Sequence, residues 1–368
     1  MRKDLLDLYS DYLISSFSLA TATGLSEMMD GAYSHDQITR MLGAEKYSQK
    51  QYWQMVKPIA RQVEQEDAAV LVDDTIEEKP HTDESELVCW HYDHSQGRSV
   101  KGINLLNFVY YSHTPTGQEV SFPVAYETVT KPEQYQDPKT KKWKRRSLVS
   151  KNDLVKERLK ILSKINHLKF KYVINDIWFS SKDTMKWIKT ELQKEFVMAL
   201  KSNRLVALSE QDKSQGHFVA LADLELKTGQ CRLVYLKGIP FPVIVAKQIF
   251  TNKDGSTGTL FLVSSETSLT YDQLTTLYQK RWKVEVIHKS LKQNAALERS
   301  PTKTIRSQSN HIFAAMIAVT KLECLKLAHH SNHFALKSKL YLKALKAAFE
   351  QLQHLNCPSL HSVKFQSA

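Results

Sequence analysis

Carboxylates stand at the ends of two apolar segments that have the composition of buried strands. Asp73 and Asp74 follow AAVLV (68–72), and Asp176 follows YVIN (172–175). Each acid by itself is equally typical of a turn, or of a helix N-cap in the case of Asp176. If the two strands lie side by side, their tips present carboxylates to one point. Because Mg²⁺ takes carboxylate oxygens together with substrate phosphates as ligands, the pair indicates a candidate divalent-cation site.

A third carboxylate belongs to a predicted helix whose polar side chains share one face. At ~100° per residue they fall within a stripe about 60° wide. Its members are Tyr278, Arg281, Glu285 and Lys292, with His288 and Lys289 on its edges. The adjacent face is apolar, so the helix can pack on a sheet and present the stripe at the domain edge. A solvated charged face accounts for Lys289 and Lys292 but less well for Tyr278 and Glu285.

The elements that must position these residues follow an α/β order from residue 68 onwards. Three strands are predicted, then a helix, a strand, a helix and a strand. The expected strands are 68–74, 102–112, 119–129, 170–179 and 196–203, and the first helix is 154–165. This is the element order of a ribonuclease-H-like α/β fold with a mixed sheet, in which the fourth strand lies beside the first.

A β-rich insertion is expected before the helix that carries Glu285. Its strand-like runs are 217–226, 231–239, 241–250 and 257–265, with a hairpin turn at 253–255. The helix itself begins with the N-terminal signature TYDQ at Thr270 and is predicted to continue unbroken to about Ala295.

Helical regions flank this core and set the expected domain boundaries. Residues 1–66 contain possible capping boxes at Ser34 and Ser48, and the short connection between them gives the rhythm of a helix-turn-helix with a recognition helix near Gln49 to Lys57. A plain helical bundle accounts for the pattern equally well. The predicted units are a DNA-binding region 1–66, a catalytic domain 67–320 with its insertion at about 205–265, and a helical C-terminal region 321–368.

The charge balance favours a polyanionic partner. The 368-residue chain has 51 Lys and Arg against 39 Asp and Glu, a formal charge of +12, and its pI is about 9.3. The tract 139–146 surrounds Trp143 with basic residues, among them Lys144, Arg145 and Arg146. It is interpreted either as a DNA-backbone contact or, equally, as a solvated loop.

Two other classes of protein are disfavoured. The four cysteines are widely separated and form no CxxC pair of the kind found in zinc and redox sites. The apolar segment 311–328 is interrupted by Lys321 and Glu323 before it reaches the ~20 residues that a membrane span needs. We therefore expect a cytoplasmic protein with no membrane partner.

The polar stripe also carries a family resemblance. Its spacing, Y-x2-R-x3-E-x6-K, resembles the signature of bacterial transposases of the insertion sequence four superfamily, and the resemblance extends over residues 68–320. In such families the first acid is usually D-x-T or D-x-S, which Asp73 satisfies through Thr75, with Asp74 as the alternative. The second acid is usually followed three residues later by an aromatic, as Asp176 is by Phe179. A small residue is commoner where Trp178 stands.

The resemblance implies a function, a cofactor and partners. It implies metal-dependent cleavage of transposon ends and strand transfer into target DNA, with Asp73, Asp176 and Glu285 holding two Mg²⁺ or Mn²⁺ ions ~3.5 to 4 Å apart. The other stripe residues, Tyr278, Arg281, His288, Lys289 and Lys292, would bind DNA, with Arg281 and Lys292 at the backbone phosphates. The implied partner is double-stranded DNA, bound by a homodimer at terminal inverted repeats in a prokaryotic nucleoid. Alternatives are a ribonuclease-H-like nuclease without joining activity and a non-catalytic DNA-binding derivative.

Overall fold

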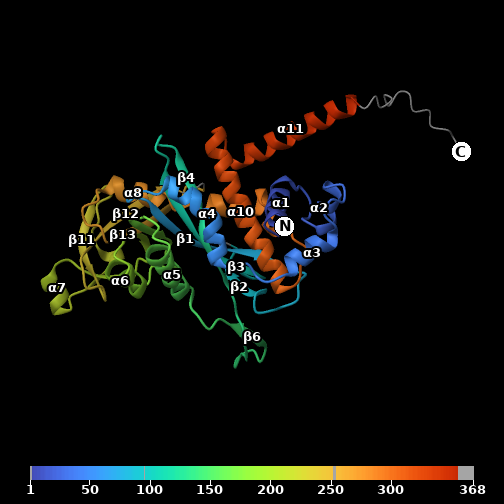
Figure 1. Ribbon diagram of the computed structural model, residues 1–368. Coiled ribbons are helices and arrows are strands. Elements are labelled where there is room, and N and C mark those ends of the chain that lie inside the picture. Colours follow the sequence, from blue (N-terminus) through green and yellow to red (C-terminus); the bar gives the residue numbers. More distant parts are fainter. Residues whose placement is uncertain (1, 95, 252–253, 355–368) are drawn as a thin grey trace.

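A mixed β-sheet forms the centre of the molecule, and helices cover its faces and extend past one end (Figure 1). The computed structural model describes residues 2–94, 96–251 and 254–354. Both parallel and antiparallel strand pairs occur in the sheet. The predicted α/β class with a mixed sheet is therefore confirmed.

The core of the sheet contains the predicted strands and one that was not predicted. In chain order they are β1 (Ala69–Glu78), β2 (Cys89–Asp93), β3 (Arg98–His113), β4 (Glu119–Val129), β7 (Tyr172–Asn175) and β8 (Glu195–Leu200). β1 pairs antiparallel with β3 and parallel with β7, which in turn runs parallel to β8. The first strand therefore lies beside the fourth predicted strand, as expected. β2 pairs with the outer edge of β3, and β4 also pairs with β3.

Two predictions for this part of the chain were wrong in part. The strand expected over 170–179 ends at Asn175, because the next residue begins a turn. The loop interpretation of the basic tract 139–146 holds only for residues 139–142, because Trp143–Arg146 form β6, which pairs with β5 (Glu133–Gln136) in a hairpin that projects from the body (Figure 1).

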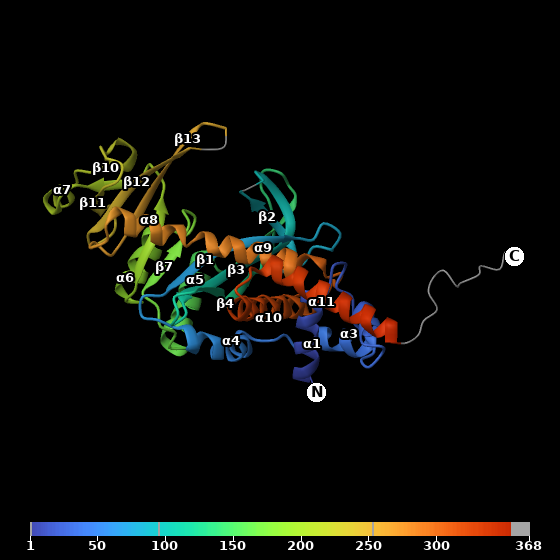
Figure 2. The same cartoon turned by 90° about the horizontal axis from the view of Figure 1, so that it is seen from above.

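The β insertion extends the sheet beyond β8. Its elements are β9 (Leu205–Ala207), α7 (Glu210–Gln215), β10 (Val219–Ala220), β11 (Cys231–Leu236), β12 (Val243–Thr251) and β13 (Thr257–Ser264). β13 pairs with β8, so the insertion and the core share one sheet (Figure 2). The hairpin of β12 and β13 is confirmed, although part of its turn lies outside the described residues. The strand expected over 217–226 is reduced to β10, which a 3₁₀ turn follows.

The N-terminal helices pack on the core and on the C-terminal helices. They are α1 (Arg2–Ser15), α2 (Ala22–Met28), α3 (His35–Gly43) and α4 (Gln49–Val63), and the capping boxes at Ser34 and Ser48 begin α3 and α4 as predicted. α4 buries Tyr52 against β4, where the phenol donates a hydrogen bond of 2.9 Å to the carbonyl of Pro123. The side of α4 that carries Lys50, Gln54 and Lys57 is exposed.

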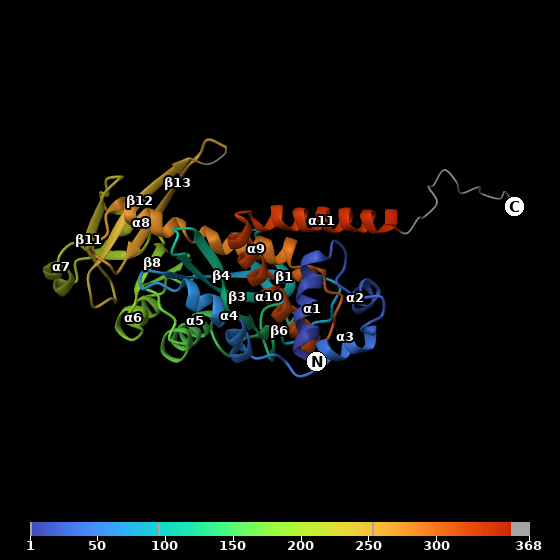
Figure 3. The same cartoon turned by 45° about the horizontal axis from the view of Figure 1, so that its top comes forward.

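The remaining helices flank the sheet, except α11, which packs on other helices. They are α5 (Lys151–Lys160) with a π-helical turn at Ile161–Ile165, α6 (Lys182–Thr190), α8 (Tyr271–Gln279), α9 (Trp282–Asn294), α10 (Ile305–His329) and α11 (His333–His354). The single helix expected from Thr270 to Ala295 is therefore wrong, although the capping box at Thr270 is present. α10 crosses residue 320 without interruption, and α11 extends away from the body (Figure 3). None of the helices in the described ranges has the length and hydropathy of a membrane span.

Gly102 allows the close approach of β1 and β3. A Cβ atom at this position would lie 2.2 Å from the carbonyl oxygen of Glu77 on the neighbouring strand. Because both atoms belong to a buried sheet, Gly102→Ala must displace β1 and is expected to lower the free energy of unfolding by about 1–3 kcal/mol. The matched control is Gly43→Ala at the end of α3, where the residue is exposed and a Cβ meets nothing within 4 Å. Denaturant unfolding measures both variants, and equal midpoints would contradict the steric argument.

Candidate active site

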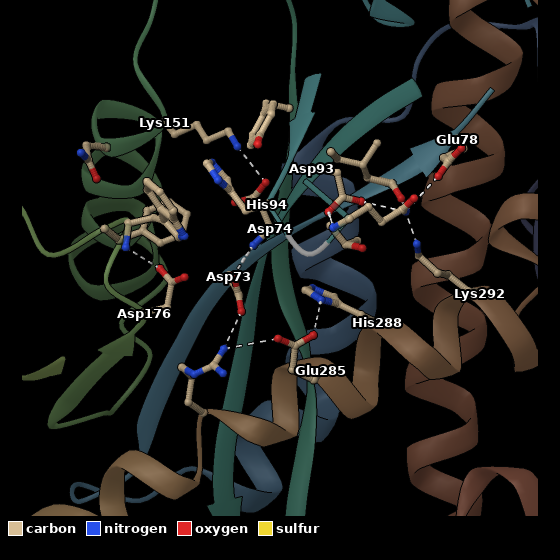
Figure 4. A pocket seen from close by; sticks show the side chains of 18 of the residues that line it. Asp73, Asp74, Glu78, Asp93, His94, Lys151, Asp176, Glu285, His288 and Lys292 are labelled. Carbon is tan, nitrogen blue, oxygen red and sulfur yellow. Dashed lines mark hydrogen bonds and ion pairs between the residues drawn. The ribbon is translucent and has the colours of Figure 1, made fainter. Parts of the chain in front are cut away.

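β1 and β7 border one cavity. The two strands pair in parallel as far as Val72 and Asn175, so the residues that follow, Asp73 and Asp176, lie next to each other where this pairing stops. The expectation that Asp73 and Asp74 end the first strand was wrong, because only β7 ends here, whereas β1 continues to Glu78 along β3. Glu285 on α9 lines the same cavity (Figure 4). The structure thus brings together three acids that are far apart in the sequence.

Asp73 and Asp74 make different contacts because successive side chains of a strand point to opposite faces. The buried Asp73 carboxylate accepts a hydrogen bond of 2.9 Å from the backbone N of Asp74, and its Oδ2 lies 2.9 Å from Nη1 of Arg281. Asp74 Oδ2 instead accepts hydrogen bonds from Asn104 Nδ2 at 2.5 Å and Lys151 Nζ at 2.7 Å. Both acids line the cavity, but Asp73 faces α9, whereas Lys151 balances the charge of Asp74.

Asp176 lies in the turn between β7 and α6. Its Oδ1 accepts a hydrogen bond of 2.9 Å from the backbone N of Trp178, which fixes the carboxylate at the cavity wall (Figure 4). Burial raises the pKa of the Asp176 carboxyl, and the hydrogen bond from Trp178 opposes that rise only in part. The same turn ends β7 early, which explains why the predicted strand is too long.

A break between α8 and α9 sets the position of Glu285. The backbone N atoms of Lys280 and Arg281 bond to carbonyls three residues earlier, which tightens the chain at this point. Glu119 on β4 accepts a hydrogen bond of 2.7 Å from Lys280 and also pairs with Lys283 on the other side of the break. This acid therefore holds both helix ends against the sheet.

Arg281, at the break, lies between two of the three acids. Its Nη1 is 2.9 Å from Asp73 and 3.4 Å from Glu285 (Figure 4). Glu285 Oε2 is also 3.6 Å from Nδ1 of His288, whose Nε2 lies 3.0 Å from the buried amide of Asn107. The hydrogen bond from His288, together with the attraction of Arg281, lowers the pKa of Glu285.

The cavity carries more negative than positive charge, because among the described residues that line it seven are Asp or Glu, against the three cations Lys151, Arg281 and Lys292. Burial raises the pKa of Asp73 to about 8, and repulsion from Asp176 and Glu285 adds to the rise. The attraction of Arg281 does not cancel these effects. A further positive charge in the cavity would therefore stabilise the ionised carboxylates.

The donor set fits a hard divalent cation, for which Asp73, Asp176 and Glu285 would supply carboxylate oxygens. The three side chains match such a cation in their charge and in the type of ligand atom. Among the described residues, no three acidic, His or Cys side chains converge closely enough to hold one ion. In the present arrangement the Arg281 guanidinium contacts Asp73 and Glu285 instead.

The other predicted stripe residues divide into two groups. His288 and Lys292 line the cavity, where Lys292 donates to the carbonyl of Ile76 at 2.9 Å. Tyr278 and Lys289 do not line it. Burial raises the pKa of Tyr278 to about 12, and Lys289 lies over the ring of Phe334 on α11. The break accounts for Tyr278, which lies on α8, whereas Lys289 lies on α9 at the edge of the stripe that faces α11.

The basic residues of the β5–β6 hairpin lie elsewhere and pair with acids. Lys144 pairs with Asp137, Arg145 with Glu84 and Arg146 with Glu133. Among the described residues that line the cavity of the acids, none is one of these three basic residues.

Sequence reasoning missed several residues of the cavity wall. Four of them are Lys151 at the start of α5, Tyr92 on β2, His94 just after β2, and Trp178. No local pattern indicates Lys151, because its partner Asp74 is 77 residues away. For Trp178 the sequence did contain a signal, because a small residue is commoner at this position in the family that the chain resembles.

Comparison with known families gives matches over most of the chain. The family model described as transposase DDE domain matches residues 148–321. The family model described as DDE superfamily endonuclease matches residues 1–217, which is more than half of the chain. A search of curated proteins gave no match.

Proposed function

The chain belongs to the DDE superfamily of transposases and endonucleases, and from this premise we propose that it cuts DNA at the ends of a mobile element and joins those ends to a target. Its mixed sheet is the ribonuclease-H-like core that this superfamily implies. We assign the catalytic carboxylates to Asp73, Asp176 and Glu285. The observation that carries the assignment is their convergence, from three separate elements, on one cavity with a deficit of positive charge.

The residues of the cavity have distinct roles in this proposal. Asp73, Asp176 and Glu285 would hold Mg²⁺ or Mn²⁺, which when bound would activate water or a 3′-hydroxyl and stabilise the leaving oxygen. His288, fixed by Asn107, orients Glu285. Arg281 and Lys292 orient the backbone phosphates beside the cut as fixed positive charges. Tyr278 supports Arg281 from the end of α8 rather than acting as a nucleophile.

The decisive test is the reaction of wild type and Glu285→Gln with DNA that carries the repeats flanking the coding region, in Mg²⁺ or Mn²⁺. Wild type is expected to cut and join, whereas Glu285→Gln binds the same DNA without cutting it. The matched control is Glu298→Gln, which makes the same change in the same cavity at a residue that pairs with Lys292. If Glu285→Gln cuts as fast as wild type, Glu285 is no metal ligand.

The same reaction separates the alternatives. Cleaved DNA without joined products would indicate a nuclease that lacks strand transfer, and binding without cleavage by wild type would indicate a non-catalytic derivative. We further propose that two copies act together on two ends in the prokaryotic nucleoid. The molecular mass of the protein in complex with transposon-end DNA tests whether it acts as a dimer.

The exposed side of α4 is our candidate for recognition of the DNA ends. Tyr52 and Trp53 are buried on its other side, so Lys50 and Lys57 can face DNA while the helix stays packed. Replacing both with Gln is expected to reduce the slope of log affinity against log salt by about 1.8, or ~0.9 per lost phosphate contact. The control is Lys164→Gln with Lys186→Gln, which removes two exposed charges elsewhere. Equal slopes for the two double variants would rule out α4.

A further inference from the structure

A second cavity adjoins the cavity of the acids, and Trp178 borders both. Its walls are the start of α6, the segment after β8 and the end of β11 in the insertion. Its volume of about 840 Å³ is within the range of ~300–1,000 Å³ typical of sites that enclose small molecules or parts of larger ones. A chain that passes the acids can therefore continue into this second cavity, which we call the insertion groove.

The insertion groove is positively charged. Four basic side chains line it, and among the described residues of its wall there is no Asp or Glu. The basic residues are Lys182, Lys201, Arg204 and Lys237. Arg204 is held in place by a hydrogen bond of 2.5 Å to the carbonyl of Ser180, whereas Lys182, Lys201 and Lys237 are exposed. The groove thus differs from the acid-lined cavity beside it and fits a row of phosphates.

Trp178 presents an aromatic surface at the entrance to this groove. Its side chain is half-exposed, which is unusual for a residue of this size next to buried Phe179. The imidazole of His94 stacks on the indole with ring centroids 3.9 Å apart and an interplanar angle of 24°. Lys201 lies 5.1 Å from the indole centroid. The indole therefore already accepts a parallel planar ring beside a cation.

We propose that the insertion groove binds an unpaired DNA strand next to the cut, with one base stacked on Trp178 in place of His94 and the phosphates along Lys201, Lys182 and Lys237. The strand is unpaired because bases inside a duplex stack on each other and present only their edges, whereas a freed base can stack on an aromatic side chain. The inference rests on the proposed function, which supplies DNA at the neighbouring acids. It adds a strand path and a base-binding residue.

Binding without cleavage tests this path. Full-length protein is titrated in chelator with a fluorescent oligothymidine of about 15 nucleotides, close to the upper site size of single-strand folds. Trp178→Ala is expected to weaken this binding by about 5- to 140-fold, as loss of one stacking platform does. Trp178→Phe retains most of the affinity because it keeps an aromatic face. The control is Trp90→Ala, which removes an equally exposed indole that borders neither cavity.

The charges are tested separately. Lys201→Gln with Lys237→Gln is expected to reduce the salt slope of oligothymidine binding by about 1.4, or ~0.7 per phosphate contact on a single strand. Lys164→Gln with Lys186→Gln is again the charge-matched control. Irradiation of an oligothymidine that contains 5-iododeoxyuridine is expected to attach the strand to the peptide that includes Trp178. This last measurement uses the wild-type protein and does not depend on the folding of any variant.

Two results would overturn the inference. One is equal affinity of Trp178→Ala and Trp90→Ala for oligothymidine, and the other is attachment of the iodinated strand only at peptides outside the groove. Neither measurement involves cleavage, so the outcome is independent of Glu285→Gln. If Trp178→Ala binds oligothymidine normally and Glu285→Gln does not cut DNA, the strand path is wrong but the catalytic assignment stands. If Trp178→Ala binds weakly and Glu285→Gln still cuts DNA, the catalytic assignment is wrong but the strand path stands.

Discussion

Asp73→Asn is expected to lower the cleavage rate by about three orders of magnitude or more, the scale on which loss of a member of a catalytic unit acts. In chelator at pH 8 the same variant is expected to be more stable than wild type. The pKa of Asp73 is raised from 3.8 to about 8, so the folded protein holds this proton more tightly than the unfolded chain. Wild type therefore loses stability as the pH rises through this range, and Asn, which does not ionise, avoids the loss.

Thermal unfolding with and without Mn²⁺ measures whether Asp73→Asn still binds the metal. A cation that binds the folded state at 100 times its Kd stabilises it by about 2.7 kcal/mol, and we expect such a shift for wild type but not for Asp73→Asn. Asp74→Asn is the matched control. It breaks the contact with Lys151, so it should lower stability in chelator and retain the response to Mn²⁺. If Asp74→Asn loses the response and Asp73→Asn keeps it, Asp74 is the first acid.

The strands that carry the first two acids could be predicted because their signals are local. AAVLV is apolar and buried at every position and, from Ala69 on, forms the first part of β1, and β4 has the bounds that its sequence indicated. The capping boxes at Ser34, Ser48 and Thr270 likewise depend on residues three positions apart. The proximity of Asp73 and Asp176 followed from the order of elements, because a fourth strand beside the first places both acids at one edge.

The features that were missed depend on contacts between distant residues. The break at Lys280 and Arg281 is stabilised by Glu119, which is about 160 positions earlier and has no local pattern that marks it. The β5–β6 hairpin pairs Glu133 with Arg146 across strands, so its basic residues form ion pairs where a solvated loop was equally expected. The periodicity of the stripe placed Arg281 beside Glu285 correctly. It did not show that Arg281 also reaches Asp73, on another element.

A buried polar cluster links α9 to the C-terminal helices and gives the largest expected effect on stability. Glu323 on α10 accepts a hydrogen bond of 2.7 Å from the backbone N of Ser121 on β4, and its carboxylate lies 2.6 Å from Lys326 and 2.9 Å from Nε2 of His333. His333 Nδ1 is in turn 2.8 Å from the hydroxyl of Ser290 on α9. The carboxylate is 1% exposed, so its partners rather than water stabilise it.

Glu323→Ala is expected to lower the free energy of unfolding by about 3–5 kcal/mol, because it leaves the buried partners of a charge without their acceptor. Denaturant unfolding measures the loss. The control is Glu66→Ala, whose partner Lys169 lies at the surface, and exposed pairs contribute only about 0–1 kcal/mol. A loss for Glu323→Ala no larger than for Glu66→Ala would show that the cluster is not a stabilising contact.

The pH dependence of this stability has a definite sign. Burial alone would raise the pKa of Glu323, but the hydrogen bond from His333 and the attraction of Lys326 outweigh it and lower the pKa below 4.5. The stabilisation is therefore fully present above pH 4.5 and is lost as the pH falls through the lower pKa of the folded state. Wild type and Glu323→Ala should accordingly converge in stability at acid pH. Since Ser290 lies on the helix that carries Glu285, the variant should also cleave DNA more slowly at neutral pH; full activity with reduced stability would show that α9 keeps its position without the cluster.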